Sequence, residues 1–475
     1  MSESVATPTP SVTRVNPLSF EGFREVVAMA GPMVLGAMSY TIMEFVDKVM
    51  VARLGSDALA AVGSSGLWSD TLSTFALGIV GCVSTFVAQA YGQERKDLCA
   101  RFTWRGIYLS IAIGFISLIF WPLSAYLFES MNHSAEVTRQ ELLYFRVRLL
   151  GYGFIAWQAA LASFFQAISR PIIPMFVAFI ANMLNILLDY LLIFGKFGFP
   201  RMEIAGAAVA TVISIGVQGA ILHWLFMTKA VDREYQSRTA TRIDRTKIWD
   251  LLRIGFPAGV ANFMDVLNWA IFTSFIVGGL GTMQLAAQTA AMNFMHFTFI
   301  PMMGFMFAAQ ALVGQWIGRG DIRAAKARAY TAMKLGSCYM LCMGSIMAFF
   351  GTPLIETFFS TDPELVDIGS KLLILAAIFA GFDGIGILSM GGLRGAGDTK
   401  FIMVITVLGT YLFSLPVAYA LAYWAGLGAV GAWMGATVYI IIMAGVMFWR
   451  FRSEKWRDIK IFSESSTPTV TPGAV

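Results

Sequence analysis

Charged residues are scarce in this sequence of 475 amino acids. Only 13% of the residues are Asp, Glu, Lys or Arg, whereas 57% are hydrophobic. A soluble domain carries about 25% charged residues, because its surface has to face water. A lipid bilayer, in contrast, solvates apolar side chains. The composition therefore excludes an ordinary soluble domain and predicts an integral membrane protein. The net charge of +5 gives no reason to expect a nucleic-acid partner.

Residues that carry catalysis, metal binding or nucleotide binding are also few. The chain has three His and four Cys, and Cys338 and Cys342 lie inside an apolar run that favours inert thiols. The sequence contains no Walker A lysine loop, no Gly-x-Ser-x-Gly elbow and no paired His for a metal. We therefore expect no enzyme and no cofactor. A transporter that uses an ion gradient is the better hypothesis.

Long apolar runs are what the sequence has in excess. A spanning helix needs about 20 mainly apolar residues. This criterion predicts an all-α integral membrane protein with twelve transmembrane helices, at 24–52, 59–91, 104–128, 142–168, 172–195, 204–228, 248–279, 284–317, 330–355, 366–393, 400–424 and 427–449. The Ser-, Thr- and Pro-rich residues 1–23 predict a disordered tail with no evident cleavable signal. Residues 451–475 form a second predicted tail.

Basic residues gather at one set of connections and predict the orientation. Four clusters follow the second, sixth, eighth and twelfth spans: Arg95, Lys96, Arg101 and Arg105; Lys229, Arg233, Arg238, Arg242, Arg245 and Lys247; Arg319, Arg323, Lys326, Arg328 and Lys334; and Arg450, Arg452, Lys455, Arg457 and Lys460. Arg146 and Arg148, at the outer start of the fourth span, are exceptions. By the positive-inside rule, both termini are predicted to be cytoplasmic. We expect a multi-pass protein of the inner (plasma) membrane.

An internal repeat divides the chain into two halves. Leu54-Gly55-x-x-x-Leu59-Ala60-Ala61 matches Leu280-Gly281-x-x-x-Leu285-Ala286-Ala287. The offset that carries Gly55 onto Gly281, which we call the repeat offset, also relates Gly78 to Gly304, and Val87-x-Gln89-x-x-Gly92 to Val313-x-Gln315-x-x-Gly318. A constant offset indicates duplication. Because each half has an even number of spans, the sequence predicts two parallel six-helix lobes around a central cavity: an N-lobe at 24–228, a cytoplasmic linker at 229–247 and a C-lobe at 248–450.

Acidic residues inside the predicted spans are functional candidates, because a charge in hydrocarbon is costly. They are Glu44, Asp47, Asp70, Asp189, Asp265 and Asp383. Glu44 and Lys48 stand four residues apart, so that pair can also simply neutralise itself. Asp47 has no evident local cation, which favours a functional role. For Asp70 the structural and functional interpretations are equally weighted.

One candidate group lies in the first half. Asn185 and Asp189 share a helix face, and Thr211 in the next span offers a hydroxyl. Hard monovalent cations prefer such oxygen ligands. The alternative is a hydrogen bond between helices that involves Asn185.

The second half holds another candidate group. Asp265 and Asp383 are carboxyls that can exchange a proton or attract a cationic substrate, and Trp269, Phe294 and His296 are nearby in the sequence pattern. Aromatic and Met side chains bind flat cations by stacking and cation–π contact. The alternatives are ordinary core or lipid-facing rings, and a structural histidine at His296.

From about Ala28 to Arg450 the sequence resembles the multidrug and toxic compound extrusion (MATE) transporters. The resemblance is carried by four stretches: Phe45-Val46-Asp47-x-Val49-Met50-Val51-Ala52-Arg53-Leu54-Gly55, Val87-Ala88-Gln89-Ala90-x-Gly92, Asn185-x-x-x-Asp189 with Gly206-Ala207-Ala208-x-Ala210-Thr211, and Leu393-Arg394-Gly395-x-Gly397-Asp398-Thr399. It implies a V-shaped bundle of twelve helices and cation-coupled efflux of organic cations or drugs. Lys48 departs from the family pattern, in which a small hydroxyl residue follows the Asp.

The resemblance also implies site residues. A cation site, for Na⁺ or H⁺, carries over onto Asp47, Asn185, Asp189 and Thr211, with the Ala207 carbonyl as a further ligand. Asp265, where Glu is usual, and Asp383 correspond to second-half acidic residues, with substrate binding expected at Asp265, Asp383, Trp269, Phe294 and His296. The expected partners are a small organic cation and the bilayer, and the expected state is a monomer. The alternative function is a flippase for a lipid-linked precursor, which should line its cavity with Arg and Lys.

Overall fold

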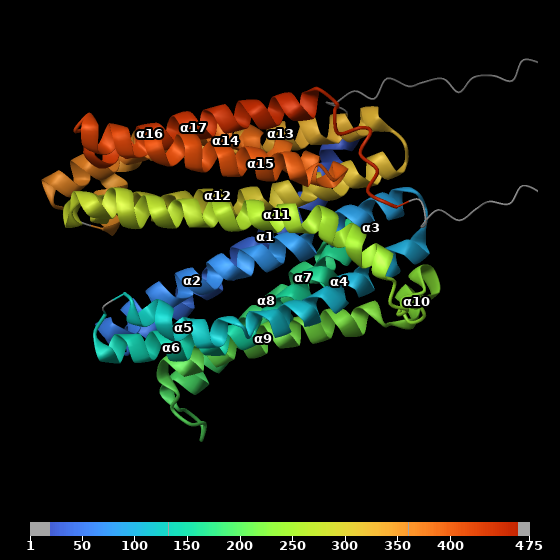
Figure 1. The fold of residues 1–475 in the computed structure, drawn as a ribbon, viewed down its shortest axis with the longest axis horizontal. Helices are drawn as coiled ribbons and strands as arrows, with labels where there is room; N and C mark the ends of the chain where they lie inside the picture. The colour runs from blue at the N-terminus through green and yellow to red at the C-terminus, as the bar shows by residue number, and fades with distance from the viewer. Residues whose placement is uncertain (1–19, 132, 360, 464–475) are drawn as a thin grey trace, which may run out of the picture.

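Helices make up the secondary structure of the computed structural model, which describes residues 20–131, 133–359 and 361–463 (Figure 1). The first half contains α1 (Phe20–Ala52), α2 (Ser56–Gly81), α3 (Val83–Gly92), α4 (Lys96–Ser117), α5 (Phe120–Glu129), α6 (Ala135–Leu150), α7 (Tyr152–Ala167), α8 (Ile172–Phe194), α9 (Glu203–Phe226) and α10 (Lys229–Tyr235). The second half contains α11 (Arg245–Ile271), η1 (Phe272–Val277), η2 (Gly278–Leu280), α12 (Thr282–Gly318), α13 (Ile322–Phe358), α14 (Pro363–Ala396), α15 (Thr399–Gly409), η3 (Thr410–Ser414), α16 (Leu415–Tyr419), η4 (Ala420–Trp424) and α17 (Gly428–Arg452). No strand occurs in these three ranges.

These helices form the twelve predicted membrane-crossing segments. Ten continuous stretches are long and apolar enough to span a bilayer, and α4 with α5 forms an eleventh that is bent by 47°. The twelfth consists of α6 and α7, which meet at Gly151. Its first part carries Glu141, Arg146 and Arg148 among other charges, and these lower its hydropathy. The predicted all-α architecture is therefore confirmed, and the α6–α7 pair is consistent with the twelfth predicted span.

Several predicted boundaries differ from the structure. The first helix begins at Phe20, so the end of the predicted tail 1–23 is helical; residues 1–19 lie outside the described part of the chain. The predicted linker 229–247 contains the helix α10 and the first turn of α11. In the predicted tail 451–475, Trp456 and Ile461 are almost fully buried. Residues 464–475 are not among those described.

The reason for this burial is that residues 453–463 pack across both lobes. The Trp456 ring stacks on Phe451 of α17 at 5.4 Å between centroids, whereas Ile461 and Phe462 join an apolar core made mostly of N-lobe side chains. Ser463 Oγ donates to Asp250 Oδ2 of α11 at 3.0 Å. These three contacts hold the segment on the protein, although its polar composition predicted a free tail.

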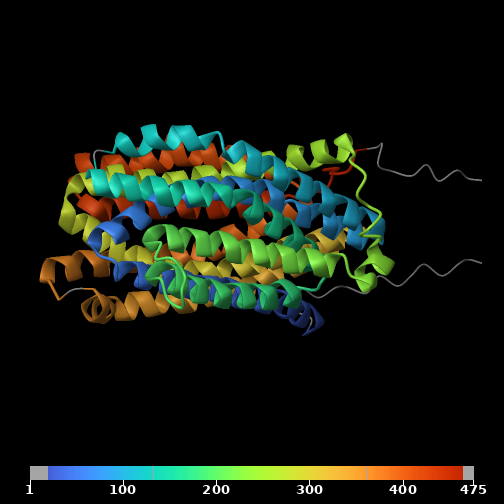
Figure 2. The ribbon, with the colours of Figure 1, turned by 90° about the horizontal axis from the view of Figure 1, so that it is seen from below.

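The helices gather into two lobes, α1–α9 and α11–α17, whose members run along the bundle (Figures 1 and 2). Within the lobes, α4 packs on α7, α8 on α9, and α14 on α12, α13 and α17. Between the lobes, α1 packs on α12, α2 on α11 and α3 on α12. Figure 1 shows the lobes meeting near α3 and α10 and diverging toward the opposite end, where α2, α5 and α6 lie apart from α12 and α16.

The contact between the lobes repeats the symmetry of the sequence. A Cβ atom on Gly92 would lie 2.0 Å from the Gln315 carbonyl oxygen, and one on Gly318 would lie 2.2 Å from the Gln89 carbonyl oxygen. Gln89 Nε2 donates to the Gly395 carbonyl at 3.0 Å, and Gln315 Nε2 donates to the Ala167 carbonyl at 2.7 Å. Under the repeat offset each glycine–carbonyl contact is the counterpart of the other, whereas the two glutamine bonds end at positions that do not correspond, because Gly395 corresponds to Ser169 and Ala167 to Leu393.

This reciprocal contact, which we call the glycine crossing (Gln89, Gly92, Gln315 and Gly318), closes one end of the molecule. Because only hydrogen fits at Gly92 and Gly318, the backbones of α3 and α12 touch. The closed end is the one that the charge pattern predicts to be cytoplasmic. The structure thus represents a conformation that is closed on that side.

Three π-helical segments, η1, η3 and η4, occur in the described chain, and all lie in the C-lobe. Two of them interrupt the span at 399–424, and η1 follows the α11 segment that carries Asp265. A π turn contains an additional residue and is frequent at functional sites. The two lobes therefore differ in helix regularity although they share a fold.

Substitution of Gly92 by Ala should open the glycine crossing. The added methyl group meets the Gln315 carbonyl, so α3 and α12 have to separate. Spin labels at Gln93 and Arg323, both exposed near this end, should show a larger distance in G92A than in the unsubstituted chain. Gly81→Ala is the control, because a Cβ there meets nothing within 4 Å. An unchanged distance in G92A contradicts the steric argument.

Candidate functional site

A buried polar group occupies the interior of the N-lobe, as the sequence predicted. Asp47 comes from α1, Asn185 and Asp189 from α8, and Thr211 from α9. With the Asn185 amide nitrogen turned toward the carboxylates, it lies 3.0 Å from Asp47 Oδ1 and 3.2 Å from Asp189 Oδ2, and the amide oxygen lies 3.3 Å from the Thr211 backbone nitrogen. Asn185 and Asp189 are fully buried. The structure thus brings together residues of three helices that are distant in the sequence.

The two carboxyl groups of this site interact with each other, and both lie within hydrogen-bond reach of the same Asn185 amide nitrogen. Two adjacent carboxylates repel unless a proton or a cation lies between them. Asp189 Oδ1 is buried and has no hydrogen-bond partner. Asp47 is only partly buried, so the pair is closed on the Asp189 side and more open on the Asp47 side. This donor set fits a proton or a small hard cation.

The other two predicted cation ligands, Thr211 and the Ala207 carbonyl, already bond to each other. Thr211 Oγ1 donates to the Ala207 carbonyl at 2.9 Å, within the same helix. That bond uses the hydroxyl proton, but leaves lone pairs on both oxygens. Thr211 and Ala207 therefore retain acceptor capacity, and the Thr211 backbone nitrogen lies beside the Asn185 amide.

A cavity of about 260 Å³ adjoins this group inside the N-lobe. Thr211 and Asn182 belong to its lining, and so do Asp70 and Arg148. Arg148 is buried, and its Nη2 donates to Asp70 Oδ1 at 2.8 Å. Arg148 Nε donates to Ser69 Oγ at 3.2 Å. The cavity therefore carries both a buried cation and a carboxylate.

Sequence reasoning missed this ion pair. It treated Arg148 as an exception to the charge pattern, at the outer end of a span, and it weighed a structural and a functional role for Asp70 equally. The structure pairs Asp70 with Arg148, and it contains the Glu44–Lys48 pair, at 2.9 Å, that the four-residue spacing allowed. The sequence did contain a sign of this pair of Asp70 and Arg148. These two charges of opposite sign lie inside predicted spans of the same lobe, and a charge buried in a membrane protein needs a partner.

The C-lobe carboxylates lie on different helices, Asp265 on α11 and Asp383 on α14, and interact electrostatically with each other. Asp265 is exposed and Asp383 is partly buried. Asp265 also interacts with Arg394, whose Nη2 donates to Asn262 Oδ1 at 2.5 Å. Neither carboxylate has a hydrogen bond or ion pair among the described residues. Both are therefore available to a ligand.

The three other side chains predicted to bind substrate, Trp269, Phe294 and His296, do not share one environment. Trp269 and Phe294 pack against the apolar C-lobe core, and Phe294 makes edge contacts with Phe358 and Phe359 at 6.2 and 5.6 Å. His296 is exposed and interacts electrostatically with Glu44 and Lys48 of the other lobe. The histidine thus interacts with charged residues of the N-lobe. Trp269 and Phe294, in contrast, are packed as ordinary core side chains, which is the alternative interpretation given for them above.

Comparison with known proteins agrees with this architecture. A family model described as MatE matches residues 32–191 and again 257–420. The chain belongs to the MATE family. The separation between the starts of the two matched regions is close to the repeat offset, so the family model independently detects the duplication. Membership of the MATE family makes the protein a transporter and not a member of an enzyme family.

Individual relatives of this MATE protein cover nearly its full length. It is 29% identical over 433 residues to the multidrug resistance protein NorM of Burkholderia vietnamiensis, covering 90% of this chain and 93% of the relative. It is 30% identical over 445 residues to the probable NorM of Mesorhizobium japonicum, with coverages of 90% and 93%. NorM proteins are therefore similar along both lobes.

Solved structures share the fold. A multidrug resistance MATE family transporter in an outward-facing conformation has a TM-score of 0.83 at 22% identity, and covers 91% of this chain and 96% of its own. A MOP superfamily transporter from Pyrococcus furiosus has a TM-score of 0.82 at 22% identity, with coverages of 93% and 96%. At this identity the likeness concerns the fold alone.

The Asp70–Arg148 pair should matter for stability more than the Glu44–Lys48 pair. Asp70→Ala leaves the guanidinium of Arg148, whose side chain is 9% exposed, without its charge partner; because Asp70 itself is 51% exposed, the expected cost is about 2 kcal/mol of unfolding free energy. Glu44→Ala removes a pair whose side chains are 58% and 39% exposed, and should cost less than about 1 kcal/mol. Equilibrium unfolding of the purified variants measures both values. Equal losses would contradict the assigned difference in burial.

Proposed function

We propose that this MATE transporter is a cation-coupled antiporter that exports organic cations or drugs by alternating access. The observation that carries the proposal is the convergence of Asp47, Asn185 and Asp189. A site of this kind binds the ion of a gradient, and binding favours the conformation with the higher affinity for that ion. The names of the NorM relatives support drug export. The localisation that we propose is the inner membrane, with both termini in the cytoplasm.

The Asn185 amide is the group that distinguishes the two coupling ions. With its nitrogen toward the carboxylates, the amide donates to both of them, which suits a carboxyl pair that shares a proton. With its oxygen toward them, the amide adds a third oxygen to the two carboxylates, and three such oxygen atoms are the ligands that a cation such as Na⁺ prefers. We assign the proton to the first orientation and Na⁺ to the second.

The substrate path that we propose runs between the lobes. Asp265 and Asp383 interact electrostatically with each other, and an organic cation approaching them gains attraction from both carboxylates. His296 interacts electrostatically with Glu44 and Lys48 of the N-lobe. Exchange then requires that the ion bound at Asp47 and Asp189 and the substrate bound between the lobes favour opposite conformations.

Neutralising the N-lobe carboxylates should uncouple export from the gradient. Asp47→Asn and Asp189→Asn should each reduce ethidium efflux from loaded proteoliposomes to the rate without a gradient. Imposed Na⁺ and proton gradients are applied separately and identify the coupling ion. Glu364→Gln, an exposed acidic residue of α14, is the matched control. Full gradient-driven export in both Asp variants would refute the N-lobe site.

The C-lobe carboxylates give a different signature. Asp265→Asn and Asp383→Asn should weaken the apparent affinity for ethidium while efflux at saturating ethidium still responds to the gradient. Loss of the gradient response in these variants alone would move the coupling site to the C-lobe. If neither gradient drives export of any organic cation by the unsubstituted protein, the antiporter proposal fails and flipping of a lipid-linked precursor becomes the function to assay.

A further inference from the structure

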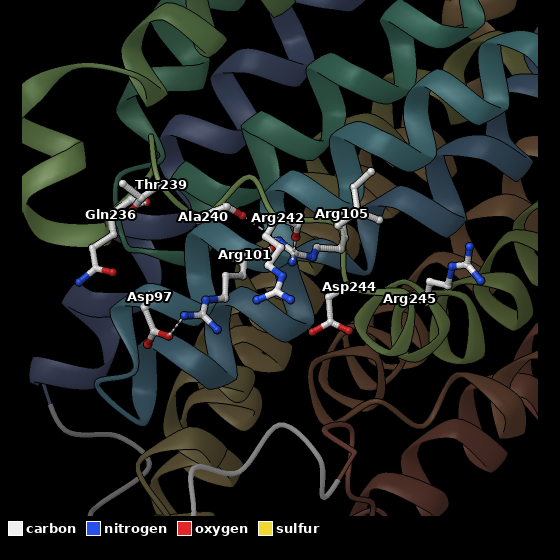
Figure 3. A pocket seen from close by; sticks show the side chains of 10 residues that line it. Asp97, Arg101, Arg105, Gln236, Thr239, Ala240, Arg242, Asp244 and Arg245 are labelled. Carbon is white, nitrogen blue, oxygen red and sulfur yellow. Dashed lines mark hydrogen bonds and ion pairs between the residues drawn. The ribbon is translucent and has the colours of Figure 1, made fainter.

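A cavity of about 490 Å³ lies where the N-lobe, the linker and the C-lobe meet (Figure 3). Its charged lining is basic in balance, with four arginines and two aspartates: Arg101, Arg105, Arg242, Arg245, Asp97 and Asp244. Arg101 and Arg105 belong to α4, Arg242 to the linker and Arg245 to the first turn of α11. The cavity thus concentrates positive charge contributed by both lobes.

Both aspartates are already engaged. Asp97 Oδ2 lies 3.4 Å from Arg101 Nη2. Asp244 accepts from the Thr246 backbone nitrogen at 3.1 Å and pairs with Lys247. The hydrogen bond from Lys247 lowers the pKa of Asp244, which therefore stays ionised and bound to its partner. Arg242 and Arg245 have no ion-pair partner in the part of the chain that the structure describes, so positive charge in the cavity is left over.

Arg105 fixes the linker backbone that lines the cavity. It is 2% exposed, and its Nη1 donates to the Ala240 carbonyl at 2.9 Å while Nη2 donates to the Arg242 carbonyl. Tyr108 donates from its hydroxyl to the Thr241 carbonyl. Arg105 Nε is buried and has no hydrogen-bond partner. The linker backbone is thus fixed on α4, and one buried N–H of the lining lacks an acceptor.

Exposed apolar side chains place this cavity at the boundary of the bilayer. Ile243 belongs to its lining and is 66% exposed. Trp249 lies on α11 four residues after Arg245, on the same helix face, and is 68% exposed. Trp residues gather at membrane–water interfaces. A ligand in the cavity would therefore have its charge among the arginines and any apolar part beside Ile243 and Trp249.

We propose that the cavity formed by Arg101, Arg105, Arg242 and Arg245 binds the phosphate headgroup of an anionic phospholipid. Guanidinium groups bind phosphate oxygens in a bidentate manner; Arg242 and Arg245 have no ion-pair partner among the described residues, whereas Arg105 uses its Nη atoms to fix the linker backbone. Soluble phosphate has the same chemistry. The position at the bilayer boundary assigns the lipid, because the acyl chains then lie along Ile243 and Trp249 instead of in water.

Such a lipid would act on the conformational equilibrium. Arg101 lies in the N-lobe and Arg245 begins the C-lobe, so a bound headgroup bridges the lobes at the end that the glycine crossing closes. Opening of that end moves α4 relative to α11 and disrupts the bridge. A ligand that prefers one conformation shifts the population toward it. Anionic lipid should therefore favour the closed end.

The test is retention of phosphatidylglycerol by the full-length protein, measured by native mass spectrometry against a phosphatidylcholine reference. Arg101→Gln and Arg242→Gln should each weaken the apparent affinity about fivefold. Arg323→Gln, an exposed arginine at the same end but outside the cavity, should leave it unchanged. An equal loss in R323Q would show diffuse surface attraction and overturn the proposal.

Two further measurements distinguish a lipid headgroup from free phosphate and test the effect of the lipid on the distance between the lobes. Inorganic phosphate is titrated into protein in phosphatidylcholine nanodiscs, and should not raise the unfolding temperature as phosphatidylglycerol does. If phosphate alone reproduces the lipid's effect and R242Q abolishes it, the ligand is a soluble anion and the lipid proposal is overturned. Spin labels at Gln93 and Arg323 should show a shorter mean distance with phosphatidylglycerol. An unchanged distance would refute the bridging role.

Discussion

Backbone contact between α3 and α12 is the constraint on which the arrangement of the two lobes depends. At this point the absence of a side chain on Gly92 and Gly318 lets each helix lie against the other's Gln carbonyl. Gln89 and Gln315 then reach across to carbonyls of the opposite lobe. A membrane-embedded interface gains little from the hydrophobic effect, so close packing and hydrogen bonds have to hold it. The two symmetric halves can therefore meet at one end and diverge at the other.

The same symmetry explains how the lobes came to hold different polar groups. In the repeat, Asp47 corresponds to Thr273, and Asp265 corresponds to Ser39. Thr273 accepts from Gln288 Nε2 at 2.7 Å, and Ser39 accepts from Asn182 Nδ2 at 2.8 Å. Where one lobe has a carboxylate, the other thus has a neutral hydrogen bond. Both members of each pair are polar, but only one of them carries charge.

Much of the fold was predictable because the bilayer imposes strong patterns. Apolar length predicted the twelve spans, and the repeat offset predicted the lobes and placed the glycines of their contact in register. The group of Asp47, Asn185 and Asp189 was also predicted, since buried carboxylates stand out in apolar runs. The Asp70–Arg148 pair was not, because helix rotation decides whether a charge near a span end turns inward. The packed residues 453–463 and the exposure of Asp265 likewise depend on tertiary contacts that leave no periodic signal.

The π-helical segments of the C-lobe give the two halves different mechanical properties. Each such turn holds one residue more than an α turn, and one residue corresponds to a rotation of about 100° around the helix axis. If a π turn moves along a span, the helix segment on one side of it rotates relative to the segment on the other side, while most backbone hydrogen bonds persist. The half with the buried carboxylate pair contains no π turn in its described residues. The chain therefore separates a half that holds the buried carboxylate pair without π turns from a half in which π turns allow a helix to rotate about its own axis.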